Sequence, residues 1–249
     1  MADELVEFPN LGLTHELRGT LTYPIGQTES MGVIILCHGL NCDRNSSFLP
    51  SLAEYLAKNG YSTLRFDFSG SGESEGTWSY SNYAGEAEDL EAAVVFLKSK
   101  SLSPIAAVGH SKAATVILIH AGTFHSVPKY VHISGRFNMG VSPTGRFSTE
   151  DLARLKQDGY LDWQGKRITS DAFEERTKLN VVDFVNKIIQ NPQFLLIHCE
   201  DDVIIPAQDS RDLQSTNPAL FPLLKIFPKG GHSLSSVRKP LFAEILAFI

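Results

Sequence analysis

Short apolar runs alternate along most of this chain with longer stretches in which apolar residues recur at helical spacing. Runs of this length indicate buried strands, and the longer periodic stretches indicate helices. Strands are predicted at about 4–9, 14–23, 32–37, 61–66, 104–109, 130–134, 193–199 and 222–227. Helices are predicted at about 47–59, 82–100, 111–121 and from 234 onward. We expect the first two strands to pair antiparallel, and the later alternation predicts a mostly parallel sheet with helices on both faces.

One long segment interrupts this alternation. More than fifty residues separate Gly135 from Gln193, which is far longer than an ordinary connection. Helices are expected at 148–158, with Ser148 as N-cap, and at 170–190, with a small hairpin between them. Six aromatic residues of the segment either attach it to the body or line an acyl or aromatic pocket: Phe137, Phe147, Tyr160, Trp163, Phe173 and Phe184.

The strand ending near residue 109 leads directly into a helix through Gly109-His110-Ser111-Lys112-Ala113. A G-x-S-x-G turn between a strand and a helix presents its serine on a strained backbone, and small flanking residues let the two elements approach closely. Ala113 replaces the last glycine and is small enough to keep that packing. Ser111 is therefore the candidate nucleophile.

Two further strand ends carry an acid and a histidine. An acidic cluster that includes Asp201 and Asp202 follows the strand at 193–199, and His232 follows the last strand on a glycine-rich loop. Open α/β sheets place their sites at the carboxyl ends of parallel strands. The order serine, acid, histidine is that of one class of Ser–Asp–His triad. The residues alone leave Asp201 and Asp202 as alternatives, and we expect Asp209 to be solvated on the next helix.

These segments together resemble the α/β-hydrolase superfamily, and among its members the small feruloyl- or cinnamoyl-esterase-like serine hydrolases. The resemblance implies an α/β-hydrolase fold with a mostly parallel, eight-stranded sheet. It also implies a single domain over residues 1–249, with a cap inserted at about 136–190 after the strand near residue 134. The matching segments are His38-Gly39, Gly109 to Ala113, His198 to Pro206, and Gly231-His232.

The resemblance also implies roles for individual residues. The family's acid-loop pattern aligns with residues 198–206 and selects Asp202, although Cys199 stands where a glycine is usual. The backbone N–H groups of Leu40 and Lys112 are the expected oxyanion-hole donors. The Lys112 side chain is expected to be solvated. Supporting positions are expected at His38, Gly39, Gly109 and His110.

A serine hydroxyl is a weak nucleophile at neutral pH, so His232 is expected to take its proton while Asp202 orients the imidazole. The sequence thus predicts hydrolysis of carboxylic esters of small acyl or aromatic type through an acyl-enzyme, with no cofactor and no metal. Two alternatives stay open. The same triad could cleave amides, peptides or thioesters, or the chain could be a non-catalytic ligand-binding homologue.

Composition narrows the class of partner. The formal net charge of −6 over 249 residues gives no argument for nucleic acid and favours solubility, and the expected partner, a small-molecule ester, follows from the expected reaction. Residues 67–74 lack the third glycine of a dinucleotide fingerprint, and the acidic run at 86–91 is expected to be a solvated helix face. No apolar run approaches a membrane span, no leader is expected, and three cysteines favour the cytoplasm. The oligomeric state is left open.

Overall fold

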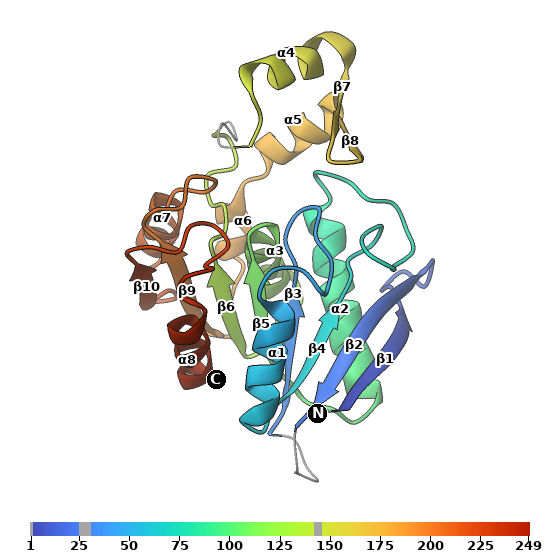
Figure 1. Ribbon diagram of the computed structural model, residues 1–249, viewed down its shortest axis with the longest axis vertical. Helices are drawn as coiled ribbons and strands as arrows, with labels where there is room; N and C mark the ends of the chain where they lie inside the picture. The colour runs from blue at the N-terminus through green and yellow to red at the C-terminus, as the bar shows by residue number, and fades with distance from the viewer. Residues whose placement is uncertain (1, 25–30, 142–145) are drawn as a thin grey trace.

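The computed structural model describes residues 2–24, 31–141 and 146–249, and its centre is an eight-stranded sheet in the order β1-β2-β4-β3-β5-β6-β9-β10 (Figure 1). The first two strands and β4 pair antiparallel, and the other neighbours pair parallel. The eight predicted strands are all present. They are β1 (Ala2–Pro9), β2 (Glu16–Tyr23), β3 (Val33–Cys37), β4 (Ser62–Phe66), β5 (Pro104–His110), β6 (Lys129–Ile133), β9 (Gln193–Cys199) and β10 (Leu223–Phe227).

Helices cover both faces of this sheet (Figure 1), and each face has its own apolar core. One core contains side chains of α2 (Tyr83–Ser99) and α3 (Lys112–Thr123), and the other contains side chains of α1 (Leu49–Lys58) and α8 (Arg238–Phe248). Along β5, Ala107 faces the first core while Ala106 and Val108 face the second, as the two-residue period of a strand requires. The doubly covered sheet confirms the predicted fold class.

The final helix begins later than its sequence pattern predicts. Residues 231–237 form successive turns, and α8 starts at Arg238. Pro240 lies in its first turn, where the missing proline N–H removes no intrahelical hydrogen bond. The helix α7 (Gln208–Thr216) fills the connection between β9 and β10.

The segment between β6 and β9, residues 136–190, is called the cap insertion below. Its upper part lies above the sheet in Figure 1 and consists of α4 (Thr149–Asp158), the hairpin of β7 (Tyr160–Trp163) and β8 (Lys166–Thr169), and α5 (Ser170–Lys178). Ser148 caps α4 through a capping box with Asp151, as its sequence predicts.

The long helix expected at 170–190 is instead two helices, which corrects that prediction. Leu179 is extended, and the Asn180 side chain accepts the Val182 N–H to begin α6 (Val181–Val185). This short helix packs against α3, where a Cβ at Gly122 would lie 2.3 Å from the Phe184 carbonyl oxygen. The asparagine cap and the close approach at Gly122 explain the break, because the chain must turn back toward the body there.

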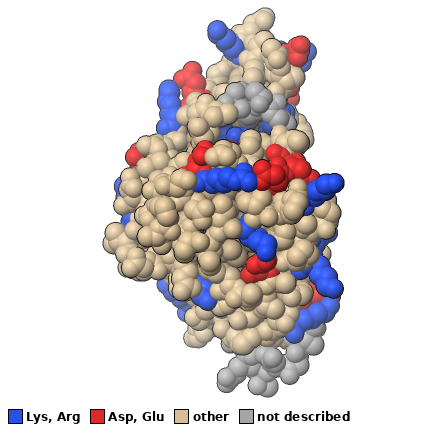
Figure 2. Space-filling view, turned by 90° about the vertical axis from the view of Figure 1, so that its left-hand side faces the viewer, with Lys and Arg blue, Asp and Glu red and all other residues tan. Residues whose placement is uncertain are grey.

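Figure 2 shows the side of the molecule that carries β10, α7 and α8. Positive and negative side chains are interspersed there on a mostly uncharged surface. Ion pairs join Arg211 to Glu200 and Lys225 to Glu244 on these elements. This face therefore offers a polyanion no large patch of positive charge. Within the described ranges, none of the helices has the length and apolarity needed to cross a membrane.

Candidate active site

Ser111 lies in the single-residue turn between β5 and α3. Its φ of 59° and ψ of −116° are unusual for a residue with a side chain, and the Ser111 N–H donates to the Ile133 carbonyl at 2.9 Å. A Cβ at Gly109 would lie 2.4 Å from the Ala113 carbonyl oxygen. Only glycine therefore fits at 109, whereas Ala113 is accommodated, which explains why the elbow tolerates alanine at its last position.

His232 connects Ser111 to an acid. The Ser111 hydroxyl lies 2.9 Å from His232 Nε2, and His232 Nδ1 lies 2.7 Å from Asp202 Oδ2. A proton on Nδ1 satisfies the carboxylate and leaves Nε2 free to accept from the hydroxyl. The structure thus brings together three side chains that the sequence predicts, from three separate strand ends.

Asp202 is buried and held from several sides. Its Oδ1 accepts the N–H groups of Ile204 and Ile205, both at 2.9 Å, and its Oδ2 lies 3.3 Å from His198 Nε2. Burial by itself raises the pKa of the Asp202 carboxyl. Hydrogen bonds from His198 and His232 outweigh that effect and hold the pKa well below its ordinary value. Asp202 therefore stays ionised across the neutral range.

Asp201, the alternative acid, is directed to the histidine loop instead of to the ring. Its carboxylate accepts the N–H groups of Gly230 and Gly231, at 3.2 and 2.8 Å. These bonds fix the turn that precedes His232. The two adjacent acids thus have different partners, the histidine loop backbone for Asp201 and the His232 ring for Asp202, because successive side chains of the loop point in different directions. The sequence does not reveal this positioning role of Asp201.

Two further histidines support the loops around His232. His110 Nε2 donates to the His232 carbonyl oxygen at 2.8 Å, and burial lowers the pKa of His110 to about 4, so its ring is neutral. His198 Nε2 donates to the Ile205 carbonyl at 2.8 Å, and its Nδ1 accepts from the Ser210 hydroxyl at 2.7 Å. His110 therefore restrains the histidine loop, and His198 restrains the acid loop.

His38 links the loop after β3 to the loop after β4. Its Nε2 accepts the Phe68 N–H at 3.1 Å, and its Nδ1 donates to the Gly39 carbonyl at 2.9 Å. A Cβ at Gly39 would lie 3.1 Å from Ser111 Cβ, so this loop passes very close to the serine. These contacts set the position of Leu40, the next residue.

Leu40, Ser111 and Lys112 line one small cavity of about 30 Å³. Among the described residues, neither the Leu40 nor the Lys112 backbone N–H has a hydrogen-bond acceptor. The Lys112 amide is at the N-terminus of α3, where intrahelical acceptors are missing by geometry. Both amides are thus available to an oxygen bound next to Ser111.

The Lys112 side chain is buried, which corrects the expectation of a solvated lysine. Its ammonium lies 2.6 Å from Glu86 Oε1, 3.2 Å from the Ser79 carbonyl and 4.9 Å from the centre of the Tyr83 ring. Burial raises the pKa of Glu86, and the Lys112 charge opposes that rise. Lys112 is also one of the residues that line the cavity.

The acidic run at 86–91 is correspondingly not a solvated face. Glu86 and Asp89 are buried and Glu88 alone is exposed. Asp89 accepts from the Ser69 N–H and hydroxyl at 2.8 and 2.9 Å. Glu91 lies 3.0 Å from His120 Nε2. The helix α2 uses its acids to hold neighbouring loops and α3.

Asp209 is buried as well, against the expectation of a solvated side chain. Its Oδ1 accepts the N–H groups of Phe137 and Asn138 at 2.8 and 3.0 Å, and its Oδ2 lies 3.4 Å from Arg136 Nη1. Asp209 thus attaches the beginning of the cap insertion to α7.

The six aromatic residues of the cap insertion do not line the cavity; among the described residues, its aromatic walls are Tyr80 and Tyr83 of the body. Phe147 and Phe173 pack on Tyr80 with ring centres 6.0 Å away, and Trp163 packs on Phe147. Phe137 and Phe184 pack on the main core, and Tyr160 is 40% exposed. Phe137, Phe147, Phe173 and Phe184 therefore attach the insertion to the body, and none of the six bears out the pocket prediction.

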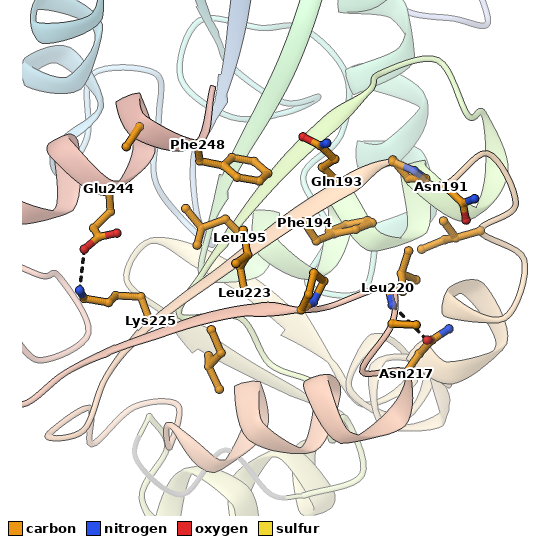
Figure 3. Close-up of a pocket in the computed structure, with 16 residues that line it drawn as sticks. Asn191, Gln193, Phe194, Leu195, Asn217, Leu220, Leu223, Lys225, Glu244 and Phe248 are labelled. Atoms are coloured by element: carbon orange, nitrogen blue, oxygen red, sulfur yellow. Dashed lines mark hydrogen bonds and ion pairs between the residues drawn. The ribbon is translucent and has the colours of Figure 1, made fainter.

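A much larger cavity, about 790 Å³, is elsewhere (Figure 3). It is lined by the beginning of β9, by β10 and by the end of α8. The strands β5 and β9 both pair parallel with β6 and therefore run in the same direction. The beginning of β9 and the end of β5 thus lie at opposite ends of the strands. Among the described residues, its charged lining side chains are Lys225 and Glu244, which pair with each other in Figure 3. Size therefore does not identify the reactive site, and we place it at the small cavity by Ser111.

Metal ligation has no candidate in the part of the chain that the structure describes. No group of three or more His, Cys, Asp or Glu side chains is placed there to hold an ion. Cys37, Cys42 and Cys199 are all free.

The chain belongs to the alpha/beta hydrolase fold family, whose model matches residues 32–186. It is similar to Est1E from Butyrivibrio proteoclasticus, solved with ferulic acid bound, at 19% identity over 98% of this chain and 97% of that one, with a TM-score of 0.78. It is also similar to the Pyrococcus furiosus esterase Pf2001, at 20% identity over 99% and 90% of the two chains, with a TM-score of 0.77.

A third similar structure is the esterase domain of a Rhodothermus marinus protein. It is 24% identical over 100% of this chain and 99% of that one, with a TM-score of 0.67. No curated protein matches the chain. At these identities the solved structures show a common fold and overall size, and the chemistry of this chain must be argued from its own residues.

Proposed function

We propose that this protein is a serine hydrolase of carboxylic esters, with Ser111 as nucleophile, His232 as general base and Asp202 as the acid that orients His232. One observation carries the proposal. A continuous line of hydrogen bonds, 2.9 Å and then 2.7 Å long, runs from the Ser111 hydroxyl through the His232 ring to Asp202. It begins at a serine that lines a cavity beside two amides without a hydrogen-bond acceptor among the described residues.

The reaction follows from these positions. His232 Nε2 takes the Ser111 proton as Oγ adds to the ester carbonyl carbon, and the Leu40 and Lys112 amides donate to the resulting oxyanion. When the tetrahedral intermediate collapses, the carbon–oxygen bond to the alcohol breaks and His232 gives its proton to that alcohol. Water then attacks the acyl-enzyme with His232 again as base, which releases the acid and restores the Ser111 hydroxyl.

Asp202 supports both steps through charge. Its depressed pKa keeps it anionic, so it stabilises the imidazolium that forms twice in each cycle. Small esters fit the site better than polymers, because the cavity by Ser111 is small and Tyr80 and two arginines of the cap insertion, Arg146 and Arg176, form part of its wall. The ferulic acid and esterase named for the similar structures agree with an ester substrate. The three free cysteines favour a reducing compartment, the cytoplasm.

The test uses 4-nitrophenyl esters from acetate to octanoate together with labelling by a fluorophosphonate. Wild type should hydrolyse and label, and Ser111→Ala should do neither. Ser236→Ala, which removes an exposed serine, is the matched control and should behave as wild type. Labelling without ester hydrolysis would favour an amide or thioester substrate. A folded wild type that neither labels nor hydrolyses would favour the non-catalytic homologue.

A further inference from the structure

Four cationic side chains line the small cavity next to Ser111: Lys112, Arg136, Arg146 and Arg176. No Asp or Glu lines it among the described residues. The other walls are apolar or aromatic, from Leu40, Tyr80, Tyr83, Ile204 and Ile205. A cavity of this size with so many cations is not what a neutral ester requires, since burying charge costs free energy unless the charge is paired.

Carboxylates behind the cavity wall account for two of the four charges. Lys112 pairs with Glu86 at 2.6 Å. Arg136 pairs with Asp209 at 3.4 Å and also donates to the Ile204 carbonyl at 3.0 Å. The other carboxylate oxygen of Asp209 accepts hydrogen bonds from two backbone N–H groups. These two cations are therefore part of the protein's own framework.

The other two cations, which like Arg136 lie in the cap insertion, have no carboxylate partner in the described part of the chain. Arg176 is buried on α5, donates to the Met139 carbonyl at 2.8 Å and lies over the Tyr80 ring. Arg146 lies over the Trp163 ring, 5.6 Å from its centre. Within the described ranges, neither guanidinium forms an ion pair, and Arg146 forms no hydrogen bond. The preceding residues 142–145 are Ser, Pro, Thr and Gly, which supply no carboxylate.

Their environment makes an anion the natural partner. Burial lowers the pKa of Arg146, the Tyr80 and Tyr83 side chains oppose that fall, and the neighbouring Arg176 and Arg136 charges add to it, so both of these guanidiniums repel Arg146. A guanidinium binds a carboxylate through two parallel hydrogen bonds, and this is stronger where water is excluded. An anion bound between Arg146 and Arg176 would offset the repulsion between the two guanidiniums and give each of them an ion-pair partner.

We propose that the substrate of the Ser111 site is an ester that itself carries an anionic group of carboxylate size, bound by Arg146 and Arg176. This inference rests on the proposed esterase function, and it names the substrate class that the function leaves open. The anion lies on either the acyl or the alcohol part of the ester, and the two arms of the test distinguish these.

The first experiment compares charged and neutral esters of the same shape. For the acyl part, mono(4-nitrophenyl) glutarate is compared with 4-nitrophenyl 5-methylhexanoate; for the alcohol part, 4-acetoxybenzoate with its methyl ester. In one of the two arms, we expect wild type to favour the charged ester in kcat/KM by about tenfold to a hundredfold. Arg146→Gln should lower that ratio at least about tenfold, and Arg176→Gln should act in the same direction.

Arg154→Gln is the matched control, because Arg154 is an exposed arginine of the cap insertion on α4. It should leave both rates unchanged. If wild type hydrolyses the neutral esters as fast as the charged ones in both arms, and Arg146→Gln leaves the ratios as they were, the inference is overturned while the esterase proposal stands.

The second experiment does not depend on turnover. Glutarate and its uncharged analogue glutaramide are titrated calorimetrically into Ser111→Ala. We expect glutarate to bind at least about tenfold more tightly, and the preference to vanish when Arg146→Gln is added. Glutarate binding by a protein whose wild type neither labels nor hydrolyses would refute the esterase proposal but keep the anion site. Equal binding of glutarate and glutaramide would refute the anion site.

Discussion

The sheet body and the cap insertion supply different kinds of group to the same cavity. The body provides Ser111, His232 and the free amides, each fixed by a strand end and by several backbone hydrogen bonds. The cap insertion provides Arg146 and Arg176, whose side chains are long and whose charges no carboxylate of the described chain pairs. On the two proposals made above, the sheet carries the bond-breaking chemistry and the insertion selects the substrate.

The largest expected effect separates two adjacent acids of the body. Asp202→Asn should lower kcat by about a thousandfold to ten-thousandfold, because the amide stabilises the wrong His232 tautomer and no imidazolium. Asp201→Asn should cost about tenfold or less, because it only loosens the loop before His232. Steady-state kinetics on a 4-nitrophenyl ester measures both. Equal losses in the two variants would contradict the assignment.

The buried pair of Lys112 and Glu86 gives the next effect, on stability. Lys112→Met should lower the free energy of unfolding by about 4 kcal/mol at pH 7, because Glu86 stays buried without its partner. Adding Glu86→Gln should recover most of that loss. Because burial raises the pKa of Glu86, the folded single variant binds a proton that the unfolded chain releases, so its deficit should shrink as pH falls. Urea unfolding at pH 7 and pH 5 measures this, and a double variant no more stable than the single one would count against the pairing.

The cap insertion has a small core of its own, which can be tested by one truncation. Ile168 on β8 is fully buried with Phe147, Leu155, Leu161 and Tyr80 of the body. Ile168→Ala should cost about 3 kcal/mol in unfolding free energy. Ile189→Ala is the control, because Ile189 is 70% exposed, and it should cost under about 0.5 kcal/mol. Equal thermal shifts in the two variants would show that the insertion adds nothing to the folded body.

The smallest effect concerns pH and the interior of the sheet. His132 on β6 is fully buried, neither ring nitrogen has a hydrogen-bond partner among the described residues, and burial lowers the pKa of His132 to about 3. Between about pH 6.5 and 3, His132 is therefore protonated in the unfolded chain and neutral in the folded protein. The free energy of unfolding therefore decreases as the pH is lowered through that window, by up to about 1.4 kcal/mol per pH unit. His132→Phe should remove this share in urea unfolding at pH 6.5 and 4.5, and an unchanged acid dependence would refute it.

Features set by local pattern could be predicted from the sequence. The apolar runs identify the eight strands, and the residues that flank Ser111 identify its turn, because both depend on neighbours in the chain. The order of Ser111, Asp202 and His232 predicts that they meet, since the ends of parallel strands share one edge. The Ser148 capping box is equally local.

Features set by contacts between distant segments could not be predicted. Lys112, Glu86 and Asp209 carry ordinary charged side chains, and each is buried only because another segment supplies its partner. The cap aromatics fit an acyl pocket and an attachment surface equally well by composition. Only the packing of Phe147 and Phe173 on Tyr80 decides between them. The position of the arginines at the cavity could not be predicted for the same reason, because it depends on how the insertion packs on the body.

The central claim, that Ser111 forms an acyl-enzyme, is tested most directly by intact-protein and peptide mass spectrometry after a short pulse with 4-nitrophenyl acetate and an acid quench. The account predicts one acetyl group per chain, located on the peptide that contains Ser111 and absent from Ser111→Ala. Hydrolysis of the ester with the acetyl group on a different residue, or with no dependence on Ser111, would contradict it.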